Sequence, residues 1–314
     1  MRIRDFTHTD WQAALDRVAV EIQPFLKQGA VADYIPALAA VDPDSFAMAV
    51  TTVHGETFTV GDADQPFSIQ SISKVFALVV ALELEGEAIW DRVGREPSGS
   101  PFNSIVQLEQ ESGKPRNPFI NPGAIVVTDS VAQHCGSSVA AETVLSFIHR
   151  CTDGQEAAID AEVAASEKAY GDRNRALAYF MKSFDVIQGD VDCALDSYFH
   201  QCAITMSTAD LSRAGLFLAA GGMNPLTGTR MTTHKRVDRV NALMMLCGHY
   251  DMSGDFAFRV GLAGKSGVGG GIMAVIPEVG CVAVWSPRLN AAGNSLAGTE
   301  ALERFSHATN VNLF

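Results

Sequence analysis

The stretch that decides the fold is SISKVFALVVALEL, residues 71–84. It opens with Ser71-Ile72-Ser73-Lys74 and continues as a nearly unbroken apolar run, which predicts a buried helix. Residues three apart share one face of a helix, so we expect the Ser71 hydroxyl and the Lys74 amine within hydrogen-bond reach. A desolvated lysine can deprotonate a serine and make it a nucleophile. Taken alone, the pattern also suits a helix-capping serine and a surface lysine, because about 0.5 matches are expected by chance.

A second short motif near the C-terminus strengthens this prediction. Lys265-Ser266-Gly267 is a K-[ST]-G sequence on or beside a predicted strand, expected by chance on the order of 0.1 times. An early S-x-x-K and a late K-[ST]-G, separated by helices, is the order found in serine β-lactamases and penicillin-binding proteins. Together they indicate acyl transfer through a covalent serine ester. The third element of that set, S-x-N or Y-x-N, is absent from the sequence.

The hydrophobic pattern predicts strands at both chain ends and helices between them. An irregular crossing rich in Pro, Gly, Ser and Asn spans 91–117. The first helix is expected to begin after Asp10 and to end by Gly29. Strands are expected at 46–53, 57–60, 256–262, 271–276 and 280–285. Further helices are expected at 71–84, 122–135, 139–151, 155–169, 173–187, 191–203, 207–220, 234–247 and 295–309.

This segregation predicts an α+β fold of the β-lactamase and penicillin-binding-protein type. We expect a mostly antiparallel sheet, built from both chain ends and flanked by helices, with an inserted all-helical lobe. The chain is expected to form one domain over residues 1–314, because no linker is long enough to separate two. Its sheet lobe would comprise about 1–75 and 226–314, and its helical lobe about 76–225.

Composition and charge exclude several classes of protein. The 314 residues include 23 Lys and Arg against 36 Asp and Glu, a formal net charge of −13. This balance, without a basic run, argues against a nucleic-acid partner. No apolar stretch approaches the roughly 20 residues of a membrane-spanning helix, and no signal peptide is evident. The six cysteines are scattered over apolar segments, as for free thiols in a reducing compartment. We therefore expect a cytoplasmic protein with a small-molecule substrate and no membrane partner.

Two other kinds of site are not supported by the sequence. Gly264-Lys265-Ser266 resembles the end of a phosphate-binding P-loop, but that pattern needs glycine at position 259, which is Arg259. The segment that follows is a predicted strand and not the helix of a P-loop. The eight histidines are dispersed and cluster with no cysteines, so we expect neither a metal site nor a cofactor.

Longer stretches of the chain resemble the serine-dependent glutaminase family, enzymes of the β-lactamase fold that hydrolyse L-glutamine to L-glutamate and ammonia. The resemblance covers essentially the whole chain, and several of the stretches are specific to that family. They are ADYIPALA (32–39), FSIQSISKVF (67–76), NPFINPGAI (117–125), EKAYGDRNRALAYF (167–180), SYFHQCAI (197–204) and YDMSGDFAFRVGLAGKSGVGGGI (250–272). The resemblance implies that the protein forms a homodimer or a homotetramer.

The resemblance also implies roles for individual residues. Ser71 would be the nucleophile, Lys74 its general base, and Tyr250 would help to relay the proton to departing ammonia. The backbone N–H groups of Ser71 and Val268 would form the oxyanion hole. The glycines beside Val268 would allow the two backbone segments to come close enough. Lys265, Ser266 and Gly267 would support the site. The substrate would contact Ser71, Tyr250 and Val268. The other residues that it would contact are Tyr34, Asn121, Glu167, Asn174 and Tyr198.

The chemistry of these side chains suits free glutamine, which carries an ammonium and a carboxylate on one carbon. Glu167 can pair with the ammonium, while Asn121, Asn174 and Tyr198 offer uncharged donors to the carboxylate. The sequence departs from the family at Pro122, which follows Asn121 where alanine is usual. Because proline restricts the residue before it, a displaced Asn121 side chain would weaken glutamine binding.

Two alternatives stay open at this point. A β-lactamase or peptidase would share the Ser71–Lys74 pair, although the missing S-x-N or Y-x-N tripeptide opposes it. A glutamine sensor without enzymatic activity would need neither a nucleophile nor a base. The joint presence of Ser71, Lys74 and Tyr250 therefore argues against a sensor.

Overall fold

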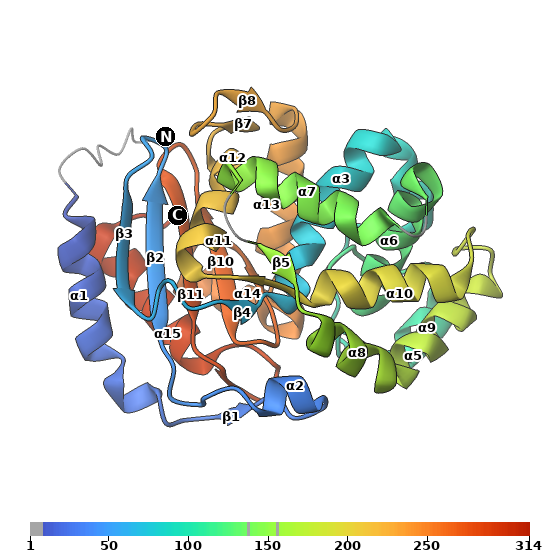
Figure 1. The fold of residues 1–314 in the computed structure, drawn as a ribbon, viewed down its shortest axis with the longest axis horizontal. Helices are drawn as coiled ribbons and strands as arrows, with labels where there is room; N and C mark the ends of the chain where they lie inside the picture. Colours follow the sequence, from blue (N-terminus) through green and yellow to red (C-terminus); the bar gives the residue numbers. More distant parts are fainter. Residues whose placement is uncertain (1–8, 137–138, 155–156) are drawn as a thin grey trace.

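The computed structural model describes residues 9–136, 139–154 and 157–314. Its centre is a five-stranded antiparallel sheet in the order β3-β2-β11-β10-β9. Strands from the two chain ends lie side by side in this sheet (Figure 1). Their bounds are β2 Ala47–Thr52, β3 Thr57–Gly61, β9 Ala263–Ser266, β10 Gly271–Ile276 and β11 Gly280–Trp285. The predicted α+β class, with an antiparallel sheet assembled from both ends, is confirmed.

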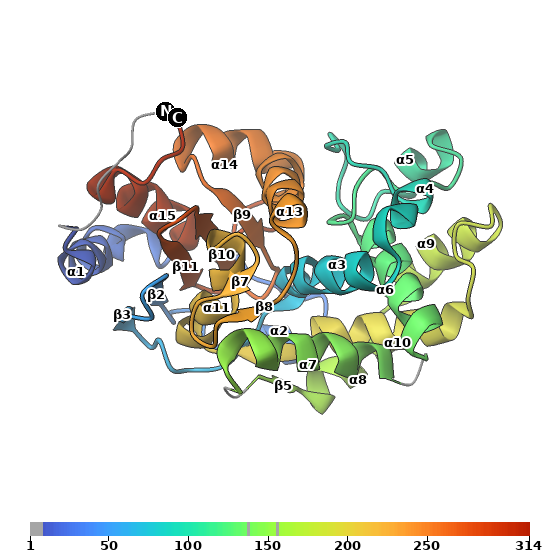
Figure 2. The same ribbon diagram turned by 90° about the horizontal axis from the view of Figure 1, so that it is seen from above.

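Helices cover both faces of this sheet, which explains why the strands β10 and β11 are apolar throughout. Along β10, Met273 belongs to one hydrophobic core and its neighbour Ile272 to the other, as the period of two in a strand requires. Helices α1 (Trp11–Glu21) and α15 (Leu296–Thr309) pack on the Ile272 face. Helix α11 (Thr208–Ala214) packs on the opposite face, as Figure 2 shows.

The Met273 core continues without a break into a group of helices beside the sheet. At their centre, α3 is buried from Ser73 to Leu82, so it needs no polar face. A three-stranded sheet, β4-β6-β5, ties the start of α3 to the end of α10. The bounds of these elements are β4 Phe67–Ser68, α3 Ser73–Leu84, α6 Asn121–Cys135, α7 Ala140–Thr152, β5 Ala158–Ile159, α8 Ala161–Ala169, α9 Asp172–Lys182, α10 Val191–Cys202 and β6 Ile204–Met206.

Shorter elements complete the described part of the chain. The remaining helices are α2 Pro36–Ala39, α4 Ile89–Arg92, α5 Ile105–Gln110, α12 Leu216–Ala219, α13 His234–Cys247 and α14 Ser253–Arg259. Strand β1 Ala30–Val31 pairs with β12 Arg288–Leu289, and β7 Met223–Asn224 pairs with β8 Thr229–Arg230. Short 3-10 turns occupy Gln23–Phe25, Gln70–Ile72, Gly86–Ala88 and Tyr250–Met252. Among the described residues, no helix combines the length and the apolarity needed to cross a membrane.

Several helix boundaries follow the sequence prediction closely. Asp10 caps α1, its carboxylate accepting a hydrogen bond of 2.9 Å from the Ala13 amide. Ser295 caps α15 in the same way, and its hydroxyl accepts from the Gly298 amide at 3.1 Å. Helix α13 has the predicted bounds. Local capping chemistry therefore sets where these helices begin.

The strand predicted at 256–262 is wrong. This region forms α14 and a turn, and the edge strand β9 begins only at Ala263. The alternation of Phe256, Phe258 and Val260 imitates a strand, but Phe258 is 88% exposed while the other two are buried. Phe256 and Val260 are four residues apart, so they share the buried face of a helical segment.

The structure also corrects three predicted helices. The first, predicted at 155–169, starts only at Ala161, because Asp160 caps α8 after the strand β5; residues 155–156 lie outside the described part. The second, predicted at 173–187, ends at Lys182, and the left-handed Asp185 follows (φ 59°). The third, predicted at 207–220, is split at Gly215 into α11 and α12. With β5, β6 and β7 between 76 and 225, the inserted lobe is not all-helical.

Candidate active site

The Ser71 segment lies against the edge of the sheet, where the turn Gln70–Ile72 leads into α3. Ser71 is 6% exposed. The strand β9 and the loop after it press directly on this turn. A side chain at Gly267 would put its Cβ 2.4 Å from the Ile69 carbonyl oxygen and 3.3 Å from the Ser71 nitrogen. Only glycine permits this approach, so the K-[ST]-G motif and the S-x-x-K motif meet as the sequence predicted.

Lys74 is buried one helical turn after Ser71, with 2% of its surface exposed. Its Nζ donates to Asn121 Oδ1 at 2.7 Å and to the Phe119 carbonyl oxygen at 3.3 Å. Burial lowers the pKa of Lys74 to about 8, although Cys202 and Glu167 act against that shift. No hydrogen bond joins Lys74 to Ser71 within the described residues. A neutral amine has two N–H bonds and one lone pair, and two carbonyl acceptors satisfy both N–H bonds and leave the lone pair free.

Tyr250 lies near Ser71, at the start of the turn Tyr250–Met252. It is 4% exposed and adopts a left-handed backbone conformation, with φ of 58°. Burial raises the pKa of Tyr250 to about 12, and the nearby hydroxyls of Ser71 and Ser266 act against that rise. Neither hydroxyl reaches the geometry of a full hydrogen bond to the Tyr250 oxygen. The phenol therefore stays protonated at neutral pH and lies beside the predicted nucleophile.

Lys265 lies beneath Tyr250, with its Nζ 4.5 Å from the centre of the tyrosine ring. It is fully buried, and this burial holds the pKa of its amine well below the usual value. The amine donates to the carbonyl oxygen of Gly248 at 3.0 Å and to that of Ser266. These bonds connect β9 to the segment that carries Tyr250, so Lys265 supports the tyrosine from behind.

The loop after β9 brings Val268 to the Ser71 turn. A Cβ at Gly269 would lie 2.2 Å from the Ser68 carbonyl oxygen, so the loop backbone touches the chain just before Ser71. Within the described part of the chain, the Val268 amide donates to no protein acceptor. It is thus a backbone donor left over beside the predicted nucleophile, as an oxyanion hole requires.

The side chains predicted to hold the amino-acid end of glutamine form two small clusters. In the first, the Tyr34 hydroxyl donates to Glu167 Oε1 at 2.7 Å. Glu167 is 4% exposed, and burial raises the pKa of its carboxyl, while hydrogen bonds from Tyr34 and Gln70 and the charge of Lys74 act against that rise. Such a carboxylate lacks a full counter-charge, which a substrate ammonium can supply.

The second cluster joins Lys74 to side chains that the sequence analysis expects to bind the substrate carboxylate. Asn121 accepts from Lys74, and its Nδ2 donates to Asn174 Oδ1 at 3.0 Å. The Asn121 amide donates to the Phe102 carbonyl oxygen at 2.9 Å. Pro122 therefore coexists with an Asn121 side chain that reaches the site, because proline is well accommodated in the first turn of a helix. Tyr198 lies below, with Lys74 Nζ 5.8 Å from the centre of its ring.

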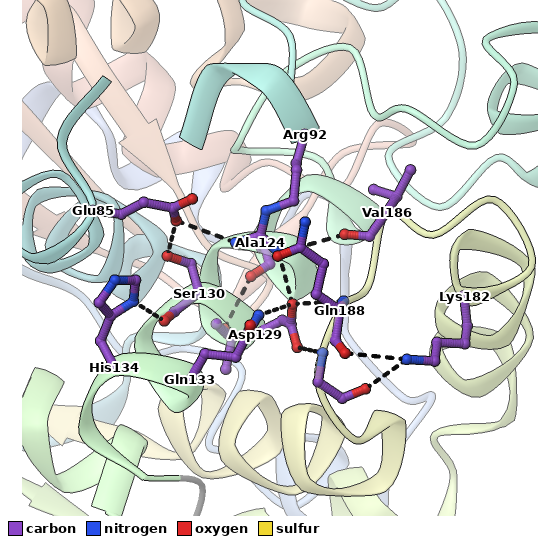
Figure 3. A network of polar contacts seen from close by, with 12 residues as sticks. Glu85, Arg92, Ala124, Asp129, Ser130, Gln133, His134, Lys182, Val186 and Gln188 are labelled. Carbon is purple, nitrogen blue, oxygen red and sulfur yellow. Dashed lines mark hydrogen bonds and ion pairs between the residues drawn. The ribbon is translucent and has the colours of Figure 1, made fainter. Parts of the chain in front are cut away.

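Helix α6, which carries Asn121 at its start, is fixed further along by a buried ion pair (Figure 3). Asp129 accepts from Arg92 at 2.7 Å and from the backbone amide of Gly189 at 2.9 Å. Arg92 also donates to Glu85 at the end of α3, at 3.1 Å. The helices that carry Lys74 and Asn121 are thus joined a second time, away from the site.

Two residues of the site were missed by the sequence analysis. Gln70 is buried and left-handed (φ 49°), and its Nε2 donates to Ser68 Oγ at 3.1 Å while its Oε1 lies 3.5 Å from the Tyr34 hydroxyl. Phe102 packs its ring 4.6 Å from that of Tyr250. Gln70 lies inside the quoted stretch 67–76, so the family resemblance was a signal that could have found it. Phe102 lies in an irregular segment, and its sequence gives no indication of this contact.

The fold and the site define a protein of the β-lactamase-like class with a serine and a buried lysine one turn apart. Residues 29–314 match the family described as glutaminase, and the chain belongs to the glutaminase family. It is 56% identical to the glutaminase of Rhizobium meliloti (strain 1021) over 306 residues, 97% of each chain.

Solved structures agree with this assignment. The probable glutaminase ybaS superposes with a TM-score of 0.92 at 39% identity, covering 97% of this chain and 98% of the other. A probable glutaminase from Bacillus subtilis, complexed with 6-diazo-5-oxo-L-norleucine, has a TM-score of 0.88 at 30% identity, covering 100% and 99%.

Proposed function

We propose that this protein hydrolyses the side-chain amide of free L-glutamine to L-glutamate and ammonia, through a glutamyl ester on Ser71. The observation that carries the proposal is the buried Lys74, whose pKa is lowered to about 8 one turn from Ser71, in a chain of the glutaminase family. A permanently charged lysine would have no lone pair for the serine proton. The glutaminase relatives support glutamine as the substrate.

In the acylation step, Ser71 Oγ attacks the side-chain carbonyl carbon of glutamine while Lys74 takes the hydroxyl proton. The proton then passes, with Tyr250 as the relay, to the amide nitrogen, and the carbon–nitrogen bond breaks to release ammonia. A water molecule attacks the resulting ester, which frees glutamate and restores the serine. Tyr250 suits the relay because its pKa near 12 keeps the phenol protonated between the two transfers.

The developing oxyanion is stabilised by the backbone amides of Ser71 and Val268. This assignment is supported by the Val268 amide, which finds no acceptor within the described residues, and by the closeness of Gly267 to the Ser71 nitrogen. Donors fixed in the backbone need no reorganisation when charge develops on the carbonyl oxygen.

Free glutamine is distinguished from glutamine in a peptide by its two charged groups. Glu167 binds the ammonium, and Tyr34 orients that carboxylate through its hydrogen bond. Asn174 and Tyr198 bind the carboxylate, with Asn121 held between Asn174 and Lys74. A peptide lacks both charges, so Glu167 would stay buried and unpaired, which disfavours binding.

The proposal is tested by measuring ammonia from free glutamine with the wild-type protein and with Ser71→Ala. The wild type should release ammonia and glutamate in equal amounts, and Ser71→Ala should lose activity by roughly 10³-fold or more. Ser183→Ala is the matched control, because Ser183 is an exposed serine whose hydroxyl donates to the Phe180 carbonyl oxygen, away from the site. Near wild-type turnover by Ser71→Ala would refute the serine mechanism.

A second substrate separates the proposal from its alternative. A chromogenic cephalosporin should not be turned over, since the proposed substrate site offers the Glu167 carboxylate for the ammonium of free glutamine. Rapid hydrolysis of the cephalosporin, without ammonia release from glutamine, would instead make the protein another acyl-serine hydrolase.

We further propose that residues 1–314 act as one catalytic domain, because the site takes side chains from both chain ends and from the helices between them.

A cytoplasmic location is supported by the six free cysteines, since thiols persist in reducing compartments. A homodimer or homotetramer would cover large exposed apolar side chains such as Phe258, which is 88% exposed, and Phe314, which is 80% exposed. Light scattering of the purified protein tests the assembly.

A further inference from the structure

The turn that carries Tyr250 is held in an unfavourable backbone conformation. Tyr250 is left-handed, with φ of 58°, in a molecule where most such positions are glycines. Left-handed conformations cost energy for residues that have a Cβ, so surrounding contacts must maintain this one. What maintains it also determines where the Tyr250 hydroxyl lies relative to Ser71.

The preceding residue, His249, makes the contacts that close this turn. Its amide donates to Ser253 Oγ at 3.0 Å, and that hydroxyl donates to the Tyr250 carbonyl oxygen at 3.0 Å. The His249 carbonyl oxygen accepts from Met252 N at 3.0 Å and from Asn294 Nδ2 at 3.4 Å. Both peptide groups that flank Tyr250 are therefore bonded to the same short segment.

The His249 ring is inserted between α14 and the edge strand β9. It stacks on Phe256 with a centroid distance of 3.5 Å and an interplanar angle of 13°. On its other side, a Cβ at Gly264 would lie 2.8 Å from His249 Nε2. Strand β9 thus carries a glycine at the position where the ring needs room, one residue before Lys265. A shift of this ring would move the support of Tyr250 as well.

The polar end of the ring is buried, and within the described residues it has no hydrogen-bond partner. His249 Nε2 and Asn294 Oδ1 are both in this state, and each residue is 2% exposed. Both residues line a cavity of about 50 Å³ between α14 and the start of α15. Charged groups on that cavity are Asp255, Arg259 and Glu300. Burial, together with the charge of Lys265 behind the ring, holds the pKa of His249 well below its usual value, so the ring is neutral.

We propose that His249 is a positioning residue for the reaction: its ring, packed between Phe256 and Gly264, and its carbonyl oxygen, bonded by Asn294, keep Tyr250 left-handed with its hydroxyl beside Ser71. The inference rests on the proposed function, because Tyr250 serves there as the proton relay. In the proposed mechanism, His249 acts through Tyr250 and has no contact with the substrate or the reacting atoms. It should therefore affect proton transfer and leave the binding of the glutamine head group intact.

His249→Ala should lower kcat roughly 10- to 100-fold, the scale expected when a catalytic group is displaced by about 1 Å. KM should change less than about twofold, because Tyr34, Glu167 and Asn174 are untouched. The space left by the ring joins the existing cavity, so added imidazole should restore part of kcat. His54→Ala is the matched control, since His54 is an exposed histidine in the turn between β2 and β3.

Asn294→Ala keeps the ring but removes its polar neighbour, and it should show the same loss in kcat at unchanged KM, without rescue by imidazole. This variant decides the question if His249→Ala fails to fold. Wild-type kcat in both variants would overturn the inference. A lower kcat together with a higher KM and a lower melting temperature, none of which imidazole reverses, would overturn it as well. A wild-type protein that releases no ammonia would overturn the proposed function instead.

Discussion

The proposed role of Lys74 as the base depends on the groups that surround its nitrogen. The described acceptors at Nζ are an amide oxygen of Asn121 and a backbone carbonyl of Phe119, and neither carries a charge. Burial therefore dominates and lowers its pKa to about 8. A carboxylate bonded to the amine would have opposed that shift and kept the lysine protonated. The two neutral acceptors at Nζ thus matter as much as the lysine itself.

The first prediction concerns the pH dependence of the reaction. Because the proposed mechanism needs Lys74 in its neutral form, kcat/KM should rise about tenfold per pH unit below pH 8 and level off above it. The profile is measured by ammonia release in overlapping buffers. Lys74→Arg should be inactive throughout, because a guanidinium does not lose its proton in this range. A profile with no inflection between pH 7 and 9 would contradict Lys74 as the base.

The second prediction separates stability from binding at Glu167. Burial raises the pKa of this carboxyl, so the folded protein gains stability on its protonation and loses that gain as pH rises through the shifted pKa. Glu167→Gln should therefore be more stable than the wild type at neutral pH and equal to it in acid. It should also bind glutamate roughly 10- to 100-fold more weakly, since a buried charged hydrogen bond is lost.

Urea denaturation at pH 7 and pH 4 checks the stability of this variant, and calorimetry checks its affinity. Glu162→Gln is the control, because Glu162 is exposed on the same helix. A Glu167→Gln protein that is less stable at pH 7 would show that the carboxylate is already compensated by charges within the protein.

At the scale of elements, α6 connects the site to the interior of the helical part. Its first residue, Asn121, bonds Lys74, and two turns later Asp129 bonds Arg92 and two backbone amides of the loop after α9. Figure 3 shows how Lys182 donates to the carbonyl groups of that same loop. The loop is therefore held by a carboxylate on one side and an ammonium on the other.

The third prediction is that Asp129→Ala lowers the free energy of unfolding by about 3–5 kcal/mol, because it leaves a buried guanidinium without its main partner. The exposed pair Arg17–Glu21 provides the control, and Glu21→Ala should cost less than about 1 kcal/mol. The two side chains of the buried pair are 8% and 1% exposed, against 68% and 37% in the surface pair. Equal losses in urea denaturation would show that the network adds nothing beyond a surface ion pair.

The helices and strands were predicted well where nearby residues determine them and poorly where tertiary packing does. The caps Asp10 and Ser295 act within one helical turn, so the starts of α1 and α15 were predicted closely. The end of α1 was wrong, because the helix predicted to reach Gly29 stops at Glu21. The segment 256–262 was misassigned because its alternating apolar residues fit both a strand and a helix, and only tertiary packing decides that Phe258 faces outward. Strands β5 and β6 were missed because two or three residues carry too little pattern.

At the scale of the whole molecule, the site joins segments that are far apart in the chain. Tyr34 precedes β2, Glu167 lies on α8, and Val268 follows β9. The motifs at 71–74 and 265–267 were predictable together because their order is known from a fold class. The contact of Phe102 with Tyr250 was not predictable, since an irregular segment has no periodicity that places a side chain in space.

The last prediction follows from this arrangement. L-glutamate, the proposed product, should bridge Glu167 on the helical side and Val268 on the sheet side, and so should stabilise the whole chain against heat. At a concentration one hundred times its Kd, it should raise the free energy of unfolding by about 2.7 kcal/mol. A thermal-shift titration measures the effect. N-acetyl-L-glutamate, which lacks the ammonium, should give little shift at the same concentration, and Glu167→Gln should weaken the response to L-glutamate itself. A shift of equal size from both ligands would mean that Glu167 does not recognise the ammonium.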